Sequence, residues 1–310
     1  MSVIPAIDLS QIPFPELAKG EPLDRTLADL EQRCSMALAG CQVKGSSPSL
    51  KTPLIQALFK TMVLREQQLL ARINSVARSV MLATASGTDL DHVAALYGVK
   101  RIDLGANYAA DSTNSRLEDD DRLRIRARLA MDALSQSGTE GEYRFHALSA
   151  SAQLKDVSVF ASDQELGKVH VCLLSRIGRG GQDDSDPFVL ELVAQALQQV
   201  RSVTDTLMIN WARIHPYHVK AILILNPGLA SEPIEATVLQ AVTALIRQNH
   251  RLGKELLRDE FFAALYQPGI AEVILEEPAT DLTLDLDSAP YNAADPEDKD
   301  TLLELSVIES

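Results

Sequence analysis

The chain has 310 residues, of which 46% are apolar and 23% are charged, and its net charge is −14. That length favours two or three domains, and the composition is typical of a soluble globular protein. The acidic balance argues against nucleic-acid binding, which needs a basic surface, and no apolar run approaches the length of a membrane span. Three cysteines without a CxxC pair indicate packed thiols in a reducing compartment.

The first fifty residues predict an arm and one short helix. Pro5, Pro13 and Pro15 interrupt the apolar residues and favour an extended arm. No basic stretch followed by an apolar one opens the chain, so no secretory signal is expected. Asp24 is a candidate cap for a helix over residues 25–40.

From Pro53 the apolar residues recur in alternating steps of four and three, which predicts a long helix with a heptad seam. Glu66 is the polar member of this seam. An internal bundle would explain the pattern, but the chain offers few other helices of matching length. Partner helices from other subunits are therefore favoured. The predicted partner-interface residues are Ile55, Phe59, Met62, Leu69, Ile73, Val76 and Val80.

A break follows the long helix at Ala85, Ser86 and Gly87. Gly87 suits the left-handed position that ends a helix. Thr88 or Asp89 is then expected to cap a short helix, which Gly98 ends. Residues 102–117 have the composition of a loop.

Four consecutive acids, residues 118–121, precede arginines at 122, 124, 126 and 128. Acids at a helix N-terminus are stabilised by the helix dipole, and this capping role is the favoured interpretation. The alternative is a carboxylate site for acid/base chemistry, which would make the protein a cytosolic hydrolase using Glu118, Asp119, Asp120 and Asp121. A further helix is expected from the sequence EYRFHALSASA.

Beyond residue 153 the pattern changes to alternation, with helices between strands. Asp186-Pro187 starts a predicted helix through Val200, Ser231 caps one over 232–248, and Asp259 caps one over 260–267. The predicted strands cover residues 154–162, 168–176, 204–214, 218–226, 270–277 and 281–287.

These elements predict an α+β fold: an N-terminal long-helix bundle segment, two small α+β domains and an acidic tail. Residues 281–310 hold nine acids and one lysine, which predicts a solvated, partly disordered end or, alternatively, a docking tail for a basic partner. The predicted divisions are an arm and short helix (1–50), a helical core (51–150), two α+β domains (151–216 and 217–289) and the tail (290–310).

The residues nominate no nucleophile, metal site or cofactor site. No GxSxG, HExxH or phosphate-loop pattern occurs in the chain. The sequence GRGGQDD at 178–184 has glycines and acids but lacks the lysine of a phosphate loop and the ligand spacing of a calcium loop. We therefore expect no catalytic residue, no metal and no cofactor.

Several stretches resemble the baseplate assembly protein J family of contractile-tailed phages. RINSVARSVMLATASGTDLDHVAALYGVKRI is similar to that family's long helix, Ala-x-Gly break and Asp-Leu-Asp helix start. EDDDRLRIRARLAMDALSQSGTEGEYRFHALSAS is similar to its acidic-then-arginine helix and the turn that follows. NPGLASEPI and QNHRLGKELLRDEFFAALYQPGIAEVIL resemble two further segments of the family. The resemblance spans about residues 50–285.

This resemblance implies a structural role in the tail baseplate of a phage or phage-tail-like particle, assembled in the bacterial cytoplasm. J-like chains form wedges around the central spike, where two copies join one tail-protein-I-like subunit and lie near other baseplate proteins of the sheath and spike. Their helices form a bundle and their C-terminal domains link into a ring, which rearranges when the sheath contracts. The seam from Ile55 to Val80 is the expected bundle contact.

Overall fold

The computed structural model describes residues 13–14, 17–40, 50, 52–103, 117–135, 137–162, 167–184, 186–228, 231–292 and 303–309. The chain divides into two compact units, Met1–Lys100 and Arg101–Ser310. It mixes helices and strands, which confirms the α+β class. Most of the predicted loop 102–117, and the start of the predicted arm, lie outside the described residues.

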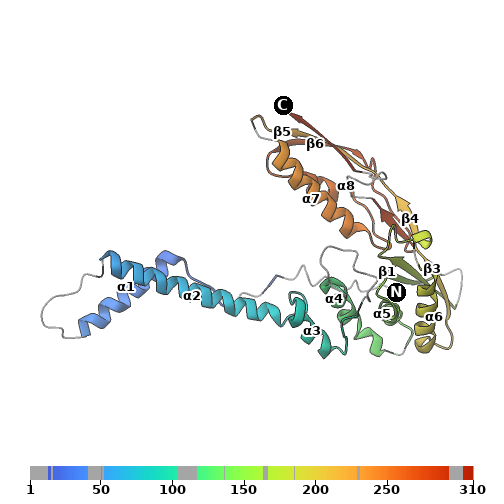
Figure 1. Cartoon of the computed structure of the whole chain (residues 1–310), viewed down its shortest axis with the longest axis horizontal. Helices are drawn as coiled ribbons and strands as arrows, with labels where there is room; N and C mark the ends of the chain where they lie inside the picture. Colours follow the sequence, from blue (N-terminus) through green and yellow to red (C-terminus); the bar gives the residue numbers. More distant parts are fainter. Residues whose placement is uncertain are drawn as a thin grey trace. The chain divides into compact units, whose positions relative to one another are not determined.

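The described part of the first unit contains three helices, which Figure 1 shows in blue and cyan. Helix α1 covers Leu23–Gly40 and packs against α2, which covers Pro53–Ser79. Pro53 occupies the first turn of α2, where its missing N–H costs no hydrogen bond. At 27 residues, α2 is about 40 Å long. The short helix α3 covers Gly87–Leu96.

The break between α2 and α3 begins earlier than predicted. Helix α2 ends at Ser79, and a turn follows it. Ser86 is the N-cap residue of α3, so the predicted cap at Thr88 or Asp89 is wrong. Gly87 does have the predicted positive φ, 55°, but it opens α3 instead of ending α2. Gly98, with φ of 72°, follows α3 as predicted.

The second unit begins with helices α4 (Asp120–Leu129) and α5 (Glu140–Ala150), separated by the 3-10 turn η3 (Asp132–Leu134). A three-stranded sheet follows in the order β1-β2-β3. Strands β1 and β2 form an antiparallel pair, whereas β3 runs parallel to β2, because helix α6 carries the chain back. The bounds are β1 Leu154–Ala161, β2 Lys168–Ser175, α6 Pro187–Val200 and β3 Thr206–Trp211.

Helices α5 and α6 pack against this sheet and against each other. Asp186 caps α6, as predicted, with its carboxylate accepting from the Phe188 amide. The core between these elements is apolar. Its fully buried members include Tyr143, Leu148, Leu154, Leu173, Val193 and Leu197.

A second sheet has the order β6-β5-β8, and Figure 1 shows helices α7 and α8 along β5 and β6. Strand β6 is antiparallel to β5, and β8 is parallel to it. A separate core, which includes Val219, Leu223, Val242 and Phe261, fills the space between helices and sheet. The bounds are β5 Val219–Leu225, α7 Ser231–Asn249, α8 Arg258–Leu265, β6 Ile270–Glu277 and β8 Leu303–Glu309.

The two cores are joined by a short parallel pair, β4 (Arg213–Pro216) and β7 (Ser288–Tyr291). The predicted strand over 204–214 is thus divided between β3 and β4. Leu174, Ala212 and Ala289 form a small apolar cluster beside this pair. The predicted positions of the two domain boundaries in this unit stay a prediction.

Four predictions in this unit were wrong. Ser231 is the first residue of α7 and not the cap before it. Asp259 lies inside the first turn of α8, and Asp281 instead accepts from the Arg258 amide at 2.8 Å. The alternating segment 281–287 forms one isolated bridge, from Leu282 to Leu256, because β5 already pairs with β6 and β8. The acidic end is not wholly a solvated tail, since residues 303–309 form strand β8, which pairs with β5.

Candidate functional site

The long helix α2 presents two apolar faces, and the first of them contacts α1. Gln56 Nε2 donates to Glu31 Oε1 at 2.5 Å near one end of the pair. Near the other end, the Asn74 side-chain amide donates to the Ala18 carbonyl at 2.9 Å and accepts from the Ala18 amide at 3.1 Å. The buried residues Phe59, Val63 and Ala77 share this face, because they lie three or four positions from one another or from these contacts.

The second face is an exposed apolar stripe. We use the term outer stripe for Leu58, Met62, Leu69, Ile73, Val76 and Val80, whose exposed fractions run from 50% for Ile73 to 67% for Val80. Successive members are separated by steps of three, four or seven residues, so they follow one side of the helix. Within its own unit, no described residue buries this side of α2.

The structure places five of the seven predicted interface residues in the outer stripe. Ile55 is half-buried at its edge, and Phe59, at 8% exposure, lies on the α1-facing side. Leu58, which the sequence reasoning missed, is 54% exposed. It lies three residues after Ile55 and four before Met62, so the same spacing rule allows it. Which of Leu58 and Phe59 is exposed depends on which side of α2 contacts α1. The heptad pattern alone does not show where α1 lies.

The acidic run 118–121 begins helix α4, where three of its members have structural contacts near the surface. Asp119 is the N-cap, accepts from the Arg122 amide at 2.8 Å and pairs with Arg176 at 2.7 Å. Asp120 pairs with Arg101 at 2.7 Å. The Asp121 side chain is 93% exposed and pairs with Arg124. The predicted capping role is therefore confirmed for Asp119.

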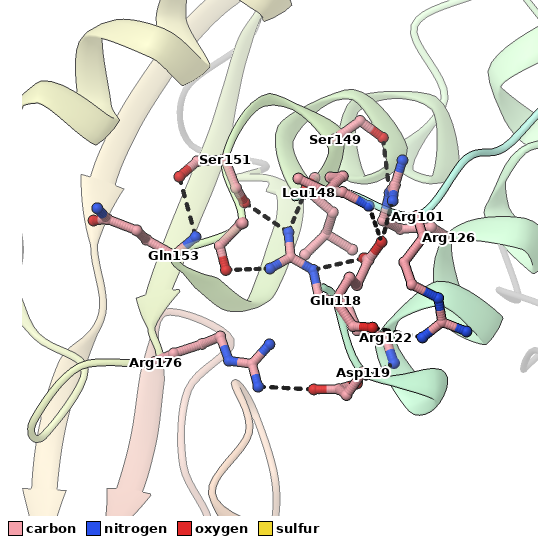
Figure 2. Close-up of polar contacts among 12 residues, drawn as sticks. Arg101, Glu118, Asp119, Arg122, Arg126, Leu148, Ser149, Ser151, Gln153 and Arg176 are labelled. Atoms are coloured by element: carbon pink, nitrogen blue, oxygen red, sulfur yellow. Dashed lines mark hydrogen bonds and ion pairs between the residues drawn. The ribbon is translucent and has the colours of Figure 1, made fainter. Parts of the chain in front are cut away.

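Glu118 differs from its neighbours because its side chain is fully buried. Its Oε1 atom lies 3.1 Å from Arg122 Nε, and its Oε2 atom lies 2.5 Å from Arg126 Nη1 (Figure 2). The Ile102 amide also donates to Oε2, at 3.1 Å. Two guanidinium groups and one backbone amide thus hold this carboxylate.

Arg122 connects this cluster to the end of helix α5. Its Nη2 atom donates to the carbonyls of Leu148 and Ser151, each at 2.6 Å, and Nη1 donates to the Ala152 carbonyl. These oxygens lie at or beyond the C-terminus of α5, where helix carbonyls lack intrahelical partners. Burial lowers the pKa of Arg122 to about 10, and Glu118 opposes that shift, so the guanidinium stays charged at neutral pH. The ion pairs and hydrogen bonds of this cluster thus hold α4 against α5.

A second polar cluster joins the two cores of the Arg101–Ser310 unit. Lys155 Nζ, on β1, lies 2.9 Å from His250 Nδ1, just after α7. Asp156 pairs with Arg144 at 2.8 Å and accepts from the Leu252 amide at 3.2 Å. Burial lowers the pKa of His250 to about 4 and that of Lys155 to about 8. The histidine is therefore neutral at pH 7, which suits an acceptor beside an ammonium group.

No group of three or more metal-ligating side chains is found in the described parts of the chain. In those same parts, every helix is too short or too polar to cross a bilayer.

The buried carboxylate and the outer stripe differ in whether another molecule can reach them. Glu118 is occupied by contacts within the chain, whereas the stripe remains open to another molecule.

An exposed apolar stripe along a helix is typical of assembly proteins, in which such a surface marks a contact with another chain. The comparisons with known proteins agree. Residues 53–106, which contain the outer stripe, match the family model described as the baseplate J-like N-terminal domain. The chain is 32% identical over 297 residues to "Baseplate protein J" of Escherichia phage P2, covering 93% of this chain and 96% of that protein. The chain belongs to the baseplate J family.

Proposed function

We propose that the protein is a structural wedge component of the baseplate in a contractile phage tail or phage-tail-like particle. The observation that carries this proposal is the 32% identity to a phage baseplate protein over nearly the whole of both chains. In this role it joins a second copy of itself and a tail-protein-I-like subunit around the central spike. The wedge is assembled in the host bacterial cytoplasm and rearranges when the sheath contracts.

The outer stripe supports a helical bundle at this wedge. Its six side chains are each at least half exposed, so covering the remaining area would contribute about 1 kcal/mol each, or about 6 kcal/mol together. Association of two proteins costs about 4–15 kcal/mol in lost freedom of motion. One helix laid on the stripe therefore gives little net affinity by itself. Contacts with more than one partner helix, as in a bundle, give a stable complex.

The Arg101–Ser310 unit supplies the remaining contacts in this proposal. Its two cores, around the sheets β1-β2-β3 and β6-β5-β8, would form the ring that links neighbouring wedges and contacts other baseplate proteins near the sheath and spike. The joint between them, with β4 beside β7 and Lys155 beside His250, is one place where a rearrangement could change the angle between the cores.

The alternative function, a cytosolic hydrolase using residues 118–121, receives no support from the geometry. Glu118 is enclosed by Arg122 and Arg126, and its side chain has no contact with solvent. Asp119 caps its own helix, and Asp121 lies almost fully exposed beside Arg124. A general acid or base must instead reach a substrate proton within hydrogen-bond distance.

The test is native mass spectrometry of the full chain co-expressed with the tail-protein-I-like subunit of the same particle. The wild type is expected to form a complex with two copies of this chain per partner. The double variant Ile73→Asp/Val76→Asp is expected to lose the complex, because two charges would be buried in the bundle without partners. Ala71→Asp/Ser75→Asp is the matched control, since both of these residues are exposed on another side of α2.

Circular dichroism of each variant alone checks that the helices still form. A complex that survives Ile73→Asp/Val76→Asp while the variant remains helical would show that the outer stripe is not the bundle contact. Loss of the complex in the control variant as well would show that added charge at any position of α2 disrupts the complex. A wild-type chain that never captures the partner would remove the support for the wedge itself.

A further inference from the structure

One flank of the outer stripe carries two arginines. Arg65 and Arg72 are exposed and one heptad apart, on the side of the stripe away from α1. Together with Gln68 and Leu69 they line a shallow hollow on the helix surface. Glu66, the sole acid of α2, lies on the opposite side of the stripe and lines the groove between α1 and α2. The outer flank is therefore purely cationic.

Neither arginine has an ion-pair partner among the residues that the structure describes. The positions three and four residues away, where a helix can place an acid, hold Thr61, Met62, Gln68 and Leu69 around Arg65. Around Arg72 they hold Gln68, Leu69, Ser75 and Val76. Helix α1 is different: Arg25 pairs with Glu21 and Arg33 pairs with Asp29.

The geometry points to a partner helix that carries acidic residues, and this inference rests on the proposed function of the outer stripe. We propose that the helix covering the stripe belongs to a different protein chain and places two carboxylates, one heptad apart, against Arg65 and Arg72. In helical bundles such flanking charges select the partner and its orientation, while the apolar seam provides most of the affinity. The two arginines would thus determine which helix occupies the stripe and in which register.

A second copy of α2 does not fit this flank. It would bring two more arginines and its single acid, Glu66, faces the α1 groove of its own hairpin. Two of the three acids of α1 are also engaged: Asp29 pairs with Arg33, and Glu31 accepts from Gln56. Like charges placed opposite one another in a bundle are unfavourable.

A membrane surface is also a poor fit. An amphipathic helix with arginines beside an apolar stripe can lie on anionic lipid. Here, however, α2 is paired with α1, whose exposed Asp24 and Asp29 would lie near the same lipid headgroups. Anionic headgroups would repel these carboxylates, so an acidic helix is the better partner for the stripe.

The experiment is a binding titration of the full chain with the tail-protein-I-like subunit at low and at physiological salt. Each single reversal, Arg65→Glu or Arg72→Glu, is expected to weaken binding about fivefold, and the double reversal about 25-fold. The wild-type affinity is expected to fall as salt rises, and the double variant Arg65→Gln/Arg72→Gln to respond less to salt. Lys60→Glu is the matched control, because Lys60 is exposed on the side of α2 opposite the stripe.

The outcomes separate this inference from the proposed function. If Arg65→Glu/Arg72→Glu binds like the wild type while Ile73→Asp/Val76→Asp does not bind, the acidic partner is refuted and the stripe remains the contact. If neither double variant weakens binding, both ideas fail. Self-association of the chain that the reversal abolishes would assign the stripe to a second copy. Binding to vesicles of anionic phospholipid that the reversal abolishes would assign it to a membrane.

Discussion

Replacing Glu118 by alanine is the sharpest test of what holds the Arg101–Ser310 unit together. The substitution removes the carboxylate that Arg122 and Arg126 share and leaves the Ile102 amide without its acceptor. Asp121→Ala is the matched control, because it removes a carboxylate from the same acidic run. The side chain of Asp121 is 93% exposed, whereas that of Glu118 is fully buried.

The expected loss follows from what each arginine retains. Breaking a buried ion pair by removing one partner costs about 3–5 kcal/mol. Arg122 would still donate to three carbonyls at the end of α5, and Arg126 would still reach Ser149 Oγ at 3.2 Å. The lower end of that range, about 3 kcal/mol, therefore applies to Glu118→Ala. Asp121→Ala removes a surface pair and a charge at the helix N-terminus, for about 1 kcal/mol at most.

Urea unfolding followed by fluorescence measures this difference. The single tryptophan of the chain, Trp211, ends β3 and packs against the core of the first sheet, so its emission reports on that core. The unfolding midpoint is expected to shift markedly for Glu118→Ala and little for Asp121→Ala, with similar slopes. Equal losses of stability in the two variants would refute the conclusion that the buried pair fastens α4 to α5.

Three further outcomes are expected. The free energy of unfolding should be highest above about pH 6.5 and fall by up to about 3 kcal/mol as the pH drops towards 4. The cause is that His250 in the folded protein has a pKa of about 4 and resists protonation, whereas in the unfolded chain it protonates. In urea titrations, His250→Gln should remove this decline. Truncation after Asn292 deletes β8 and exposes the edge of β5, so light scattering should show aggregation. A thiol reagent should modify the half-buried Cys34 before the buried Cys172, because burial raises the pKa of the Cys172 thiol to about 11.

Each of these has a contradicting result. A pH profile that His250→Gln leaves unchanged would assign the acid sensitivity to other groups. A truncated chain that stays monomeric and equally stable would show that β8 contributes little to its sheet. Modification of Cys172 at the rate of Cys34 in the folded protein, identified by peptide mass, would show that the interior of the first core opens readily to solvent.

The regular elements were predictable because their residue periods are unambiguous. The alternation of Val157, Val159 and Val171 indicates strands, and the Asp186-Pro187 pair marks the start of α6. The segment 281–287 alternates just as clearly but is not a strand, because its neighbours in space have other partners. Pairing depends on which edges are available, and a single segment carries no information about that.

The candidate site was predictable in the same partial way. Heptad spacing predicts that α2 is an interaction helix, but the spacing fits both Leu58 and Phe59, and contact with α1 determines which one faces outward. Glu118 has arginines four and eight positions later, on the same side of α4. That spacing was an available signal for the buried ion pairs, although burial itself depends on α5 and could not be read from the run of acids.

The pairing of β4 with β7 has a consequence for the order of folding. These strands adjoin each other, yet about 70 residues separate Pro216 from Ser288, and closing a flexible loop of that length costs about 4 kcal/mol of chain entropy. The intervening residues form their own core, from β5 through β6. Once that core has formed, most of the loop is already ordered and the ends meet at a lower entropic cost. Damage to the second core should therefore also slow the docking of β7 onto β4, which couples the folding of one half of the unit to the other.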